Sequence, residues 1–130
     1  MALKDDDCAE LPTVVLGFVD AVNTSDLATI VGCFAPRAIV NDDLVEYQGI
    51  DAIALWAREH VVGQKLSIEV LRVLRGGAHA AALAKVDGTF DKRGLPDPLE
   101  LTFYFCAEGN RLVQLLILRN EPALALTEGR

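Results

Sequence analysis

Residues 11–34 read LPTVVLGFVDAVNTSDLATIVGCF, and this stretch decides how the chain begins to fold. Apolar residues recur in it with the spacing of an amphipathic helix, at Leu11, Val14, Val15, Phe18, Val19 and Val22. Pro12 suits the first turn because its φ angle is already helical. Asn23-Thr24-Ser25 then interrupts the pattern and offers a helix cap. A second, shorter set of apolar residues has helical spacing and ends before Pro36: Leu27, Ile30, Val31 and Phe34. The sequence therefore predicts two helices that pack as one unit.

The next segment changes period and leads into a third helix. Residues 37–47 read as a short strand, a tight turn at Asn41-Asp42-Asp43 and a returning strand. After Gly49, apolar residues return to helical spacing at Ile50, Ile53, Ala54, Ala57 and Val61. Asp51 favours the first turn of this helix, and Gly63 lies just past its end. The helix also carries Trp56 and His60.

The second half of the chain is strand-like. Turn clusters divide it into four predicted strands, at residues 65–75, 78–90, 98–107 and 111–119. The run Ala80–Ala84 has helix propensity, but turn signals bound it between two stronger strands, which favours a strand. Three helices followed by a strand meander predict an α+β domain, with the helices on one face of a strongly curved, mostly antiparallel sheet.

The other face of that sheet needs a cover of its own. Leu99, Leu101, Phe103 and Phe105 alternate with Glu100, Thr102 and Tyr104, so the two sets point to opposite faces. We expect the outer face to be buried in a homodimer.

Length and composition limit the classes of protein. The 130 residues fit one domain, residues 1–130, and we expect residues 1–9 and 121–130 to be mobile ends. The formal net charge of −7 argues against nucleic acid or an anionic membrane as a partner. Three widely spaced cysteines, Cys8, Cys33 and Cys106, suggest neither disulfides nor a zinc site. The start MALKDDD does not resemble a signal peptide, so a cytoplasmic location is expected.

Polar residues within this apolar sequence are the candidates for chemistry. No P-loop, GxGxxG, GxSxG or HExxH pattern occurs, and we expect no cofactor. Strand alternation places Asp42 on the same face as Ala38 and Val40, toward the interior, and turns Asp43 the other way. Opposed faces also argue against a metal held by Asp42, Asp43 and Glu46. Taken alone, Asn41-Asp42-Asp43 is more typical of a surface turn than of a functional site, because Asn and Asp favour turns by hydrogen bonding locally.

A resemblance adds weight to Asp42. Residues 14–43 match the pattern N-x-x-D-L-x-x-I-V-x-x-F-A-x-x-A-x-V-x-D from Asn23 to Asp42, and resemble the start of bacterial ketosteroid isomerases. These enzymes belong to the nuclear transport factor 2-like superfamily, as do SnoaL-type polyketide cyclases. The resemblance implies a cone with an apolar cavity, closed by helices, and a catalytic base at Asp42. It covers about residues 11–120 and becomes specific only to the fold after residue 50.

The same resemblance reveals departures from the family pattern. A tyrosine and a protonated aspartate donate hydrogen bonds to the reacting oxygen in ketosteroid isomerases. Their positions correspond to Phe18 and Leu101, and a supporting tyrosine corresponds to Ala57. Loss of one such donor costs about 10² to 10³ in rate. Glu100, next to Leu101, would reach the interior only through a bulge or a shifted register, which the Leu99/Leu101/Phe103 alternation opposes.

Two interpretations of function remain open. In one, the protein binds a small hydrophobic molecule and Asp42 transfers a proton, as in an isomerase or a cyclase. In the other, the same fold carries a ligand or associates as a dimer without catalysis. The pocket residues expected in either case are Phe18, Val40, Trp56, His60, Leu101 and Phe103. His60 is either a donor at the cavity mouth or a solvated helix histidine, and Trp56 is either cavity wall or core.

Overall fold

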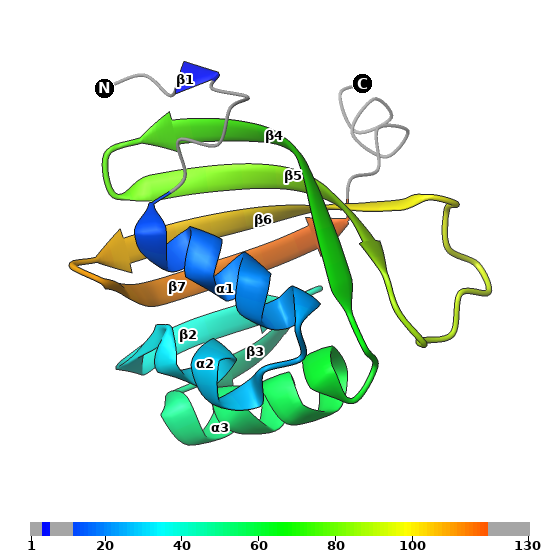
Figure 1. Ribbon diagram of the computed structural model, residues 1–130, viewed down its shortest axis with the longest axis horizontal. Coiled ribbons are helices and arrows are strands. Elements are labelled where there is room, and N and C mark those ends of the chain that lie inside the picture. The colour runs from blue at the N-terminus through cyan, green and yellow to red at the C-terminus, as the bar shows by residue number, and fades with distance from the viewer. Residues whose placement is uncertain (1–3, 6–11, 120–130) are drawn as a thin grey trace.

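The computed structural model describes residues 4–5 and 12–119, and it forms an α+β domain (Figure 1). Leu11 and most of the two ends that were expected to be mobile lie outside the described residues. Within the N-terminal end, Lys4–Asp5 is described and forms a short strand that the sequence did not predict. The helical segments are α1 (Thr13–Asn23), α2 (Leu27–Gly32), α3 (Ile50–Trp56) and the π-helix η1 (Ala57–Val62). The strands are β1 (Lys4–Asp5), β2 (Phe34–Asp42), β3 (Val45–Gln48), β4 (Ser67–Gly76), β5 (His79–Asp87), β6 (Leu99–Glu108) and β7 (Arg111–Arg119).

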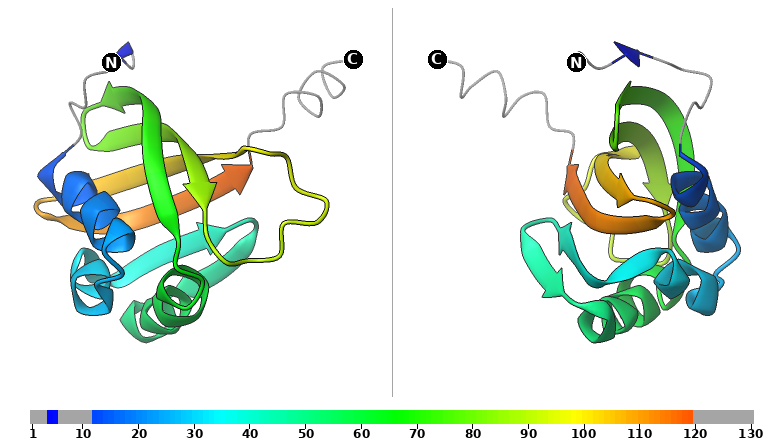
Figure 2. Two further views of the ribbon diagram at one scale, coloured as in Figure 1. Left: turned by 45° about the vertical axis from the view of Figure 1, so that its right-hand side comes forward. Right: turned by 90° about the vertical axis from the view of Figure 1, so that its left-hand side faces the viewer.

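All strands belong to one mixed sheet in the order β1-β4-β5-β6-β7-β2-β3. Every neighbouring pair is antiparallel except β2 and β7, which run parallel. The predicted mostly antiparallel sheet with three helices is therefore confirmed. Helices α1 and α2 lie on one face of the sheet, and α3 lies beside β2 and β3 (Figure 1; Figure 2). Within the described residues, no helix is both long and apolar enough to cross a membrane.

The second predicted helix is shorter in the structure than the apolar stripe implied. It ends at Gly32, and Phe34 begins β2, so Pro36 lies inside a strand. The reason is tertiary pairing, since Phe34 aligns with Leu112 of β7 and the Leu112 amide donates to the Cys33 carbonyl over 2.7 Å. Asp26, rather than residues 23–25, caps this helix, and its carboxylate accepts from the Thr29 amide at 3.2 Å.

Asn23 has a different function from the expected cap. Its side-chain Nδ2 donates to the Ile68 carbonyl over 2.9 Å, and its Oδ1 accepts from the Ile68 amide over 2.7 Å. The side-chain amide of Asn23 thus makes the two hydrogen bonds to Ile68 of β4 that a neighbouring strand would make. Ile68 lies 45 positions after Asn23 in the sequence. This pairing joins the end of α1 to the beginning of β4.

The third predicted helix is split into two kinds of helix. It is α-helical through Trp56 and then becomes the π-helix η1, which ends at Val62 before Gly63, where an end was predicted. π-Helical turns are rare and occur frequently at functional sites. Gly49 precedes α3 with φ 87°, a conformation that favours glycine.

The core lies between the helices and the inner face of the sheet. The segment with helix propensity, Ala80–Ala84, is a strand as predicted, with Ala80, Ala82 and Ala84 buried. Phe103 and Phe105 of β6 are also buried, whereas Tyr104 between them is 44% exposed on the other face. Edge-to-face contacts between aromatic rings join α1 to the sheet, with Phe18 5.8 Å from both Phe34 and Phe105.

Candidate functional site

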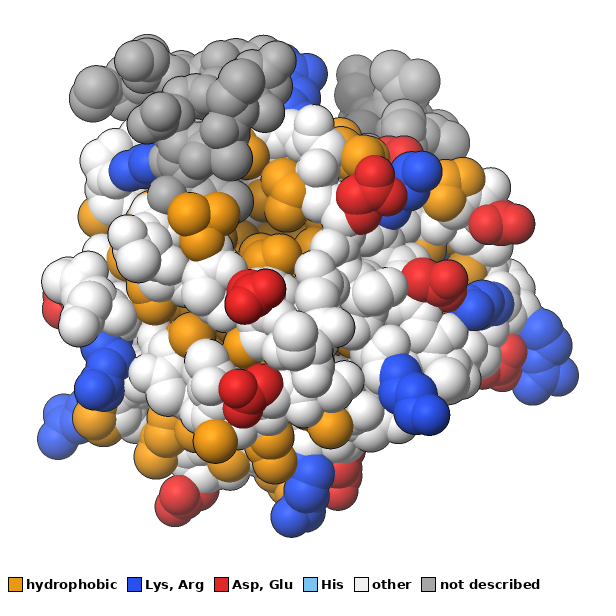
Figure 3. Space-filling view, in the orientation of Figure 1, with side chains coloured by type: hydrophobic (Ala, Val, Ile, Leu, Met, Phe, Trp, Pro, Cys, Tyr) orange, Lys and Arg blue, Asp and Glu red, His pale blue; other side chains and the backbone are white. Residues whose placement is uncertain are grey.

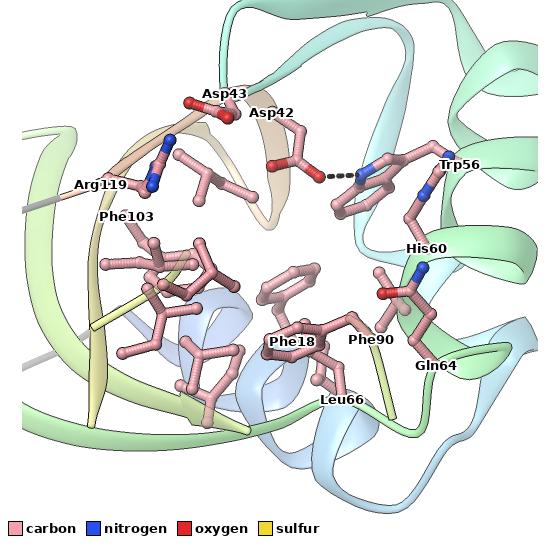
Figure 4. Close-up of a pocket in the computed structure, with 18 residues that line it drawn as sticks. Phe18, Asp42, Asp43, Trp56, His60, Gln64, Leu66, Phe90, Phe103 and Arg119 are labelled. Carbon is pink, nitrogen blue, oxygen red and sulfur yellow. Dashed lines mark hydrogen bonds between the residues drawn. The ribbon is translucent and has the colours of Figure 1, made fainter. Parts of the chain in front are cut away.

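The candidate site is a pocket of about 310 Å³ whose wall consists of residues from the helices, the sheet and the β5–β6 connection. Figure 4 shows its lining. Thirteen of the eighteen lining residues are apolar: Phe18, Val22, Trp56, Val61, Leu66, Ile68, Val86, Phe90, Leu95, Leu99, Leu101, Phe103 and Ile117. The polar ones are Asp42, Asp43, His60, Gln64 and Arg119. Such a largely apolar hollow with a few polar groups is typical of sites for small molecules.

Asp42 is the last residue of β2, and its half-buried side chain lies at the pocket wall (Figure 4). Trp56 Nε1 donates a hydrogen bond to Asp42 Oδ2 over 3.0 Å. The side chain of Trp56 itself is buried, with 2% exposed. The hydrogen bond therefore ties the carboxylate to the end of α3, while Oδ1 accepts no hydrogen bond from any described residue.

Asp43 also lines the pocket, which corrects the prediction that it faces away from Asp42. Strand alternation stops applying at this point because β2 ends at Asp42 and Asp43 has φ 52° in the following turn. The turn is closed by a hydrogen bond from the Leu44 amide to Asn41 Oδ1 at 2.9 Å. The cluster is thus both a turn and part of the pocket wall. The described residues contain no group of three acids, histidines or cysteines arranged to hold a metal ion.

Five of the six predicted pocket residues line this pocket: Phe18, Trp56, His60, Leu101 and Phe103. Val40 does not line it and is fully buried in the core, because it lies one strand repeat deeper than Asp42. Glu100 does not line the pocket, in agreement with the alternation in β6. It aligns with Lys85 of β5. Phe18 and Leu101 thus bring apolar side chains to the wall.

Sequence reasoning did not name twelve of the eighteen lining residues as pocket residues, and three groups of them show why. Gln64 lies just past the end of η1, where Gly63 already signals a helix end, so the helical pattern does not extend to it. Arg119 aligns with Leu101 across the β6–β7 pair, which a single sequence does not reveal. Phe90 and Leu95 come from the β5–β6 connection, whose path depends on tertiary contacts.

Tyr47 of β3 packs beside the polar end of the pocket. Its ring centroid is 6.3 Å from Trp56 and 6.2 Å from His60. Burial raises the pKa of the Tyr47 phenol, and the negative charges of Asp42 and Glu59 raise it further. The phenol therefore remains protonated at neutral pH and above.

A second hollow of about 720 Å³ adjoins this pocket and shares lining residues with it, including Phe90, Leu95 and Leu99. Its other walls carry more charge, from Glu69, Lys85, Asp87, Lys92 and Asp97. On the part of the molecule shown in Figure 3, acidic and basic side chains are interspersed over the described surface. The smaller pocket, rather than the larger one, combines an apolar wall with a half-buried carboxylate.

Comparisons with known proteins agree with this architecture. A structure described as a "putative polyketide cyclase" from Sinorhizobium meliloti is 31% identical and has a TM-score of 0.74, covering 83% of this chain and 95% of that one. SalBIII, an epoxide hydrolase/cyclase-like enzyme in pyran ring formation in the polyether salinomycin, is 17% identical with TM-score 0.69, covering 82% and 88%.

A protein with a ketosteroid isomerase-like fold from Catenulispora acidiphila, in complex with trimethylamine, is 17% identical with TM-score 0.68, covering 91% of this chain and 93% of that one. The comparison with curated protein sequences finds no match. The model of the SnoaL-like domain matches residues 15–115. The chain therefore belongs to the SnoaL-like domain family, with the ketosteroid isomerase-like fold that the residues around Asn23–Asp42 resembled.

Proposed function

We propose that the protein binds a small, hydrophobic carbonyl compound in this pocket and that Asp42 transfers a proton as general acid and base. The observation that carries the proposal is the half-buried Asp42 carboxylate in a largely apolar wall, held by Trp56 Nε1 at 3.0 Å. In this proposal the fold is a cone that the helices close around the ligand. The S. meliloti relative described as a "putative polyketide cyclase" supports a cyclase or isomerase type of reaction.

The proposed step needs no further reactant. The Asp42 carboxylate removes a proton from the carbon next to the ligand's carbonyl group, and the electron pair of that C–H bond moves to the carbonyl oxygen as an enolate. In a ligand that also has a C=C bond conjugated with this enolate, return of the proton at the far carbon shifts the double bond and isomerises the ligand. Attack of the enolate on a second carbonyl instead closes a ring, and the proton from Asp42 neutralises the new alkoxide. General acid–base catalysis of this kind contributes about 10² to 10⁴ in rate.

The experiment measures deuterium uptake from D₂O into the methyl group of 2-acetylnaphthalene, a neutral hydrophobic ketone, by NMR. We expect the protein to accelerate uptake, Asp42→Asn to abolish about 99% of that acceleration while still binding the ketone, and Asp43→Asn to keep most of it. Acceleration that survives in Asp42→Asn would overturn the role of Asp42.

A second candidate is a binding protein without catalysis. The observation that favours it is that Phe18 and Leu101 present apolar side chains at the two wall positions where ketosteroid isomerases are expected to have donors. Binding of 2-acetylnaphthalene without any deuterium uptake would support this alternative.

We also propose that the protein forms a homodimer through the outer face of the sheet. Apolar side chains that are half-buried or exposed lie there, among them Leu83, Tyr104, Leu116 and Leu118, and cross-strand pairing aligns Tyr104 with Leu116 and Ala81. Light scattering should give twice the mass of the chain at micromolar concentration. Leu116→Lys should give the monomer mass, because it buries a charge at the interface. A wild-type monomer at that concentration would overturn the dimer.

A further inference from the structure

The pocket contains polar groups whose hydrogen-bonding capacity no described residue uses. Trp56 donates its single N–H to Asp42. The side chains of His60 and Gln64 make no hydrogen bond with any described residue. A polar group that loses contact with water is destabilising unless it finds a partner, so each of these side chains is a candidate to bind a polar atom of the ligand.

Gln64 is held in place through its main chain. Its carbonyl oxygen accepts from the Thr89 amide over 2.7 Å, which joins the end of the third helix to the β5–β6 connection. Gly88 approaches the same carbonyl so closely that a Cβ there would lie 2.6 Å from the oxygen. On the other side, the Leu66 amide donates to the Val61 carbonyl over 3.0 Å. The main chain of Gln64 is therefore anchored on both sides.

The side chain of Gln64 extends from this anchored position to the pocket wall. Figure 4 shows its amide on the same wall as Trp56 and His60, and Gln64 lies beyond the end of η1. Gln64 is half-buried, whereas His60 is exposed at the pocket mouth. A hydrogen bond from Gln64 to a ligand therefore competes less with water than one from His60, which favours Gln64 as the donor.

The charges at the pocket wall restrict the class of ligand. The lining has two acidic side chains, Asp42 and Asp43, and one guanidinium, Arg119, so acidic groups outnumber it. Like charges repel more strongly where water is excluded, and a carboxylate or phosphate ligand is disfavoured. The wall suits an uncharged ligand that offers an oxygen to a neutral amide donor.

We infer that the side-chain amide of Gln64 donates a hydrogen bond to an uncharged oxygen of the bound ligand and thereby determines which hydrophobic molecules the pocket selects. This inference rests on the proposed binding of a hydrophobic molecule in the pocket, but not on catalysis by Asp42. Gln64 is the polar contact that Phe18 and Leu101 do not supply. The amide offers two N–H donors, so one ligand oxygen can be bound in more than one orientation.

The test uses two probes of the same shape, 2-acetylnaphthalene and the hydrocarbon 2-isopropylnaphthalene. Trp56 is the only tryptophan in the sequence, so its indole N–H gives one NMR signal at the pocket wall, and its shift on titration measures both affinities. We expect Gln64→Met to lower the ratio of ketone affinity to hydrocarbon affinity by about 3- to 10-fold, because one hydrogen bond is lost. Gln64→Glu, which removes the amide donor, should also lower it.

Gln114→Met is the matched control, since Gln114 is exposed on β7 outside the pocket lining, and the affinity ratio should not change. A ratio that is unchanged in both Gln64 variants would overturn the inference. A drop in His60→Leu but not in Gln64→Met would also overturn it and assign the donor to His60. If neither probe shifts the Trp56 signal, the proposed pocket fails as well. If both probes bind but Gln64 has no effect, only the inference about Gln64 fails.

Discussion

Trp56 Nε1 and Asp42 Oδ2 are 3.0 Å apart and joined by a hydrogen bond, which connects the last residue of α3 to the last residue of β2. The indole is buried and the carboxylate half-buried, so a charged acceptor is bound at the boundary between core and pocket. Hydrogen bonds to charged groups are stronger than those between neutral groups. The contact fixes the direction of the only carboxylate that the sequence assigned a catalytic role.

Replacing Asp42 by Leu should move the NMR signal of the Trp56 indole N–H upfield, because the proton loses its charged acceptor. Asp43→Leu is the control, since Asp43 lines the same pocket without bonding to the indole, and its effect on the signal should be much smaller. Equal shifts in the two variants would show that the indole signal does not report this hydrogen bond.

Phe18→Tyr should increase deuterium uptake into 2-acetylnaphthalene by about tenfold or more, because it adds a hydroxyl donor to the pocket wall. Phe18 is also the position at which the family resemblance implies a tyrosine. Phe34→Tyr is the matched control: its ring lies 5.8 Å from that of Phe18 but does not line the pocket. No increase in Phe18→Tyr, or an equal one in Phe34→Tyr, would contradict the prediction.

Asn23→Ala should destabilise the protein by about 2 to 3 kcal/mol, because it removes two hydrogen bonds and leaves the amide and carbonyl of Ile68 without these partners. Urea unfolding followed by circular dichroism measures the change in the free energy of unfolding. Thr24→Ala is the control. It removes only the hydrogen bonds from the Thr24 hydroxyl to main-chain carbonyls of α1, so it should lower the free energy of unfolding by less. A similar loss in both variants would mean that Asn23 does not anchor β4.

The cap of α2 should make stability depend on acid pH. A side-chain hydrogen bond from Thr29 lowers the pKa of Asp26, with a further contribution from the Thr29 amide. The ionised carboxylate therefore stabilises the folded protein fully above the unfolded-state pKa of about 3.9, and this contribution is lost as the pH falls through the lower folded-state pKa.

Asp26→Asn keeps a capping oxygen but removes the titration. The free energy of unfolding of the wild type, relative to this variant, should rise between about pH 2 and pH 5 and then remain constant. Thermal unfolding measured at several pH values tests this. A difference that is independent of pH across this range would contradict the role of the Asp26 charge.

The predictable part of the fold came from local patterns. The helical stripe from Val14 to Val22 and the alternation from Leu99 to Phe105 each depend on residues close in sequence, and both elements formed as predicted. The same local pattern extended the second helix too far, since Phe34 fits a helical stripe equally well. Its pairing with Leu112, 78 positions later, decided otherwise.

For the site too, only the features that depend on local alternation could be predicted. Alternation along β2 turned Asp42 toward the inside, but it could not reach Asp43, where the backbone leaves the strand with a positive φ. It also could not identify Gln64 and Arg119 as neighbours of one pocket, because they come from different elements.

The sequence by itself determined the order of the three helical segments and the long strands and the apolar face of each, because side-chain direction repeats with the period of a helix or a strand. It left Asp42 open between an inward position and a surface turn. Only the tertiary structure decided that Trp56 binds Asp42 and that Gln64, Arg119 and Asp43 share a pocket. These relationships depend on how strands pair and how helices cross the sheet, and such long-range packing leaves no periodic signal in the residues that take part.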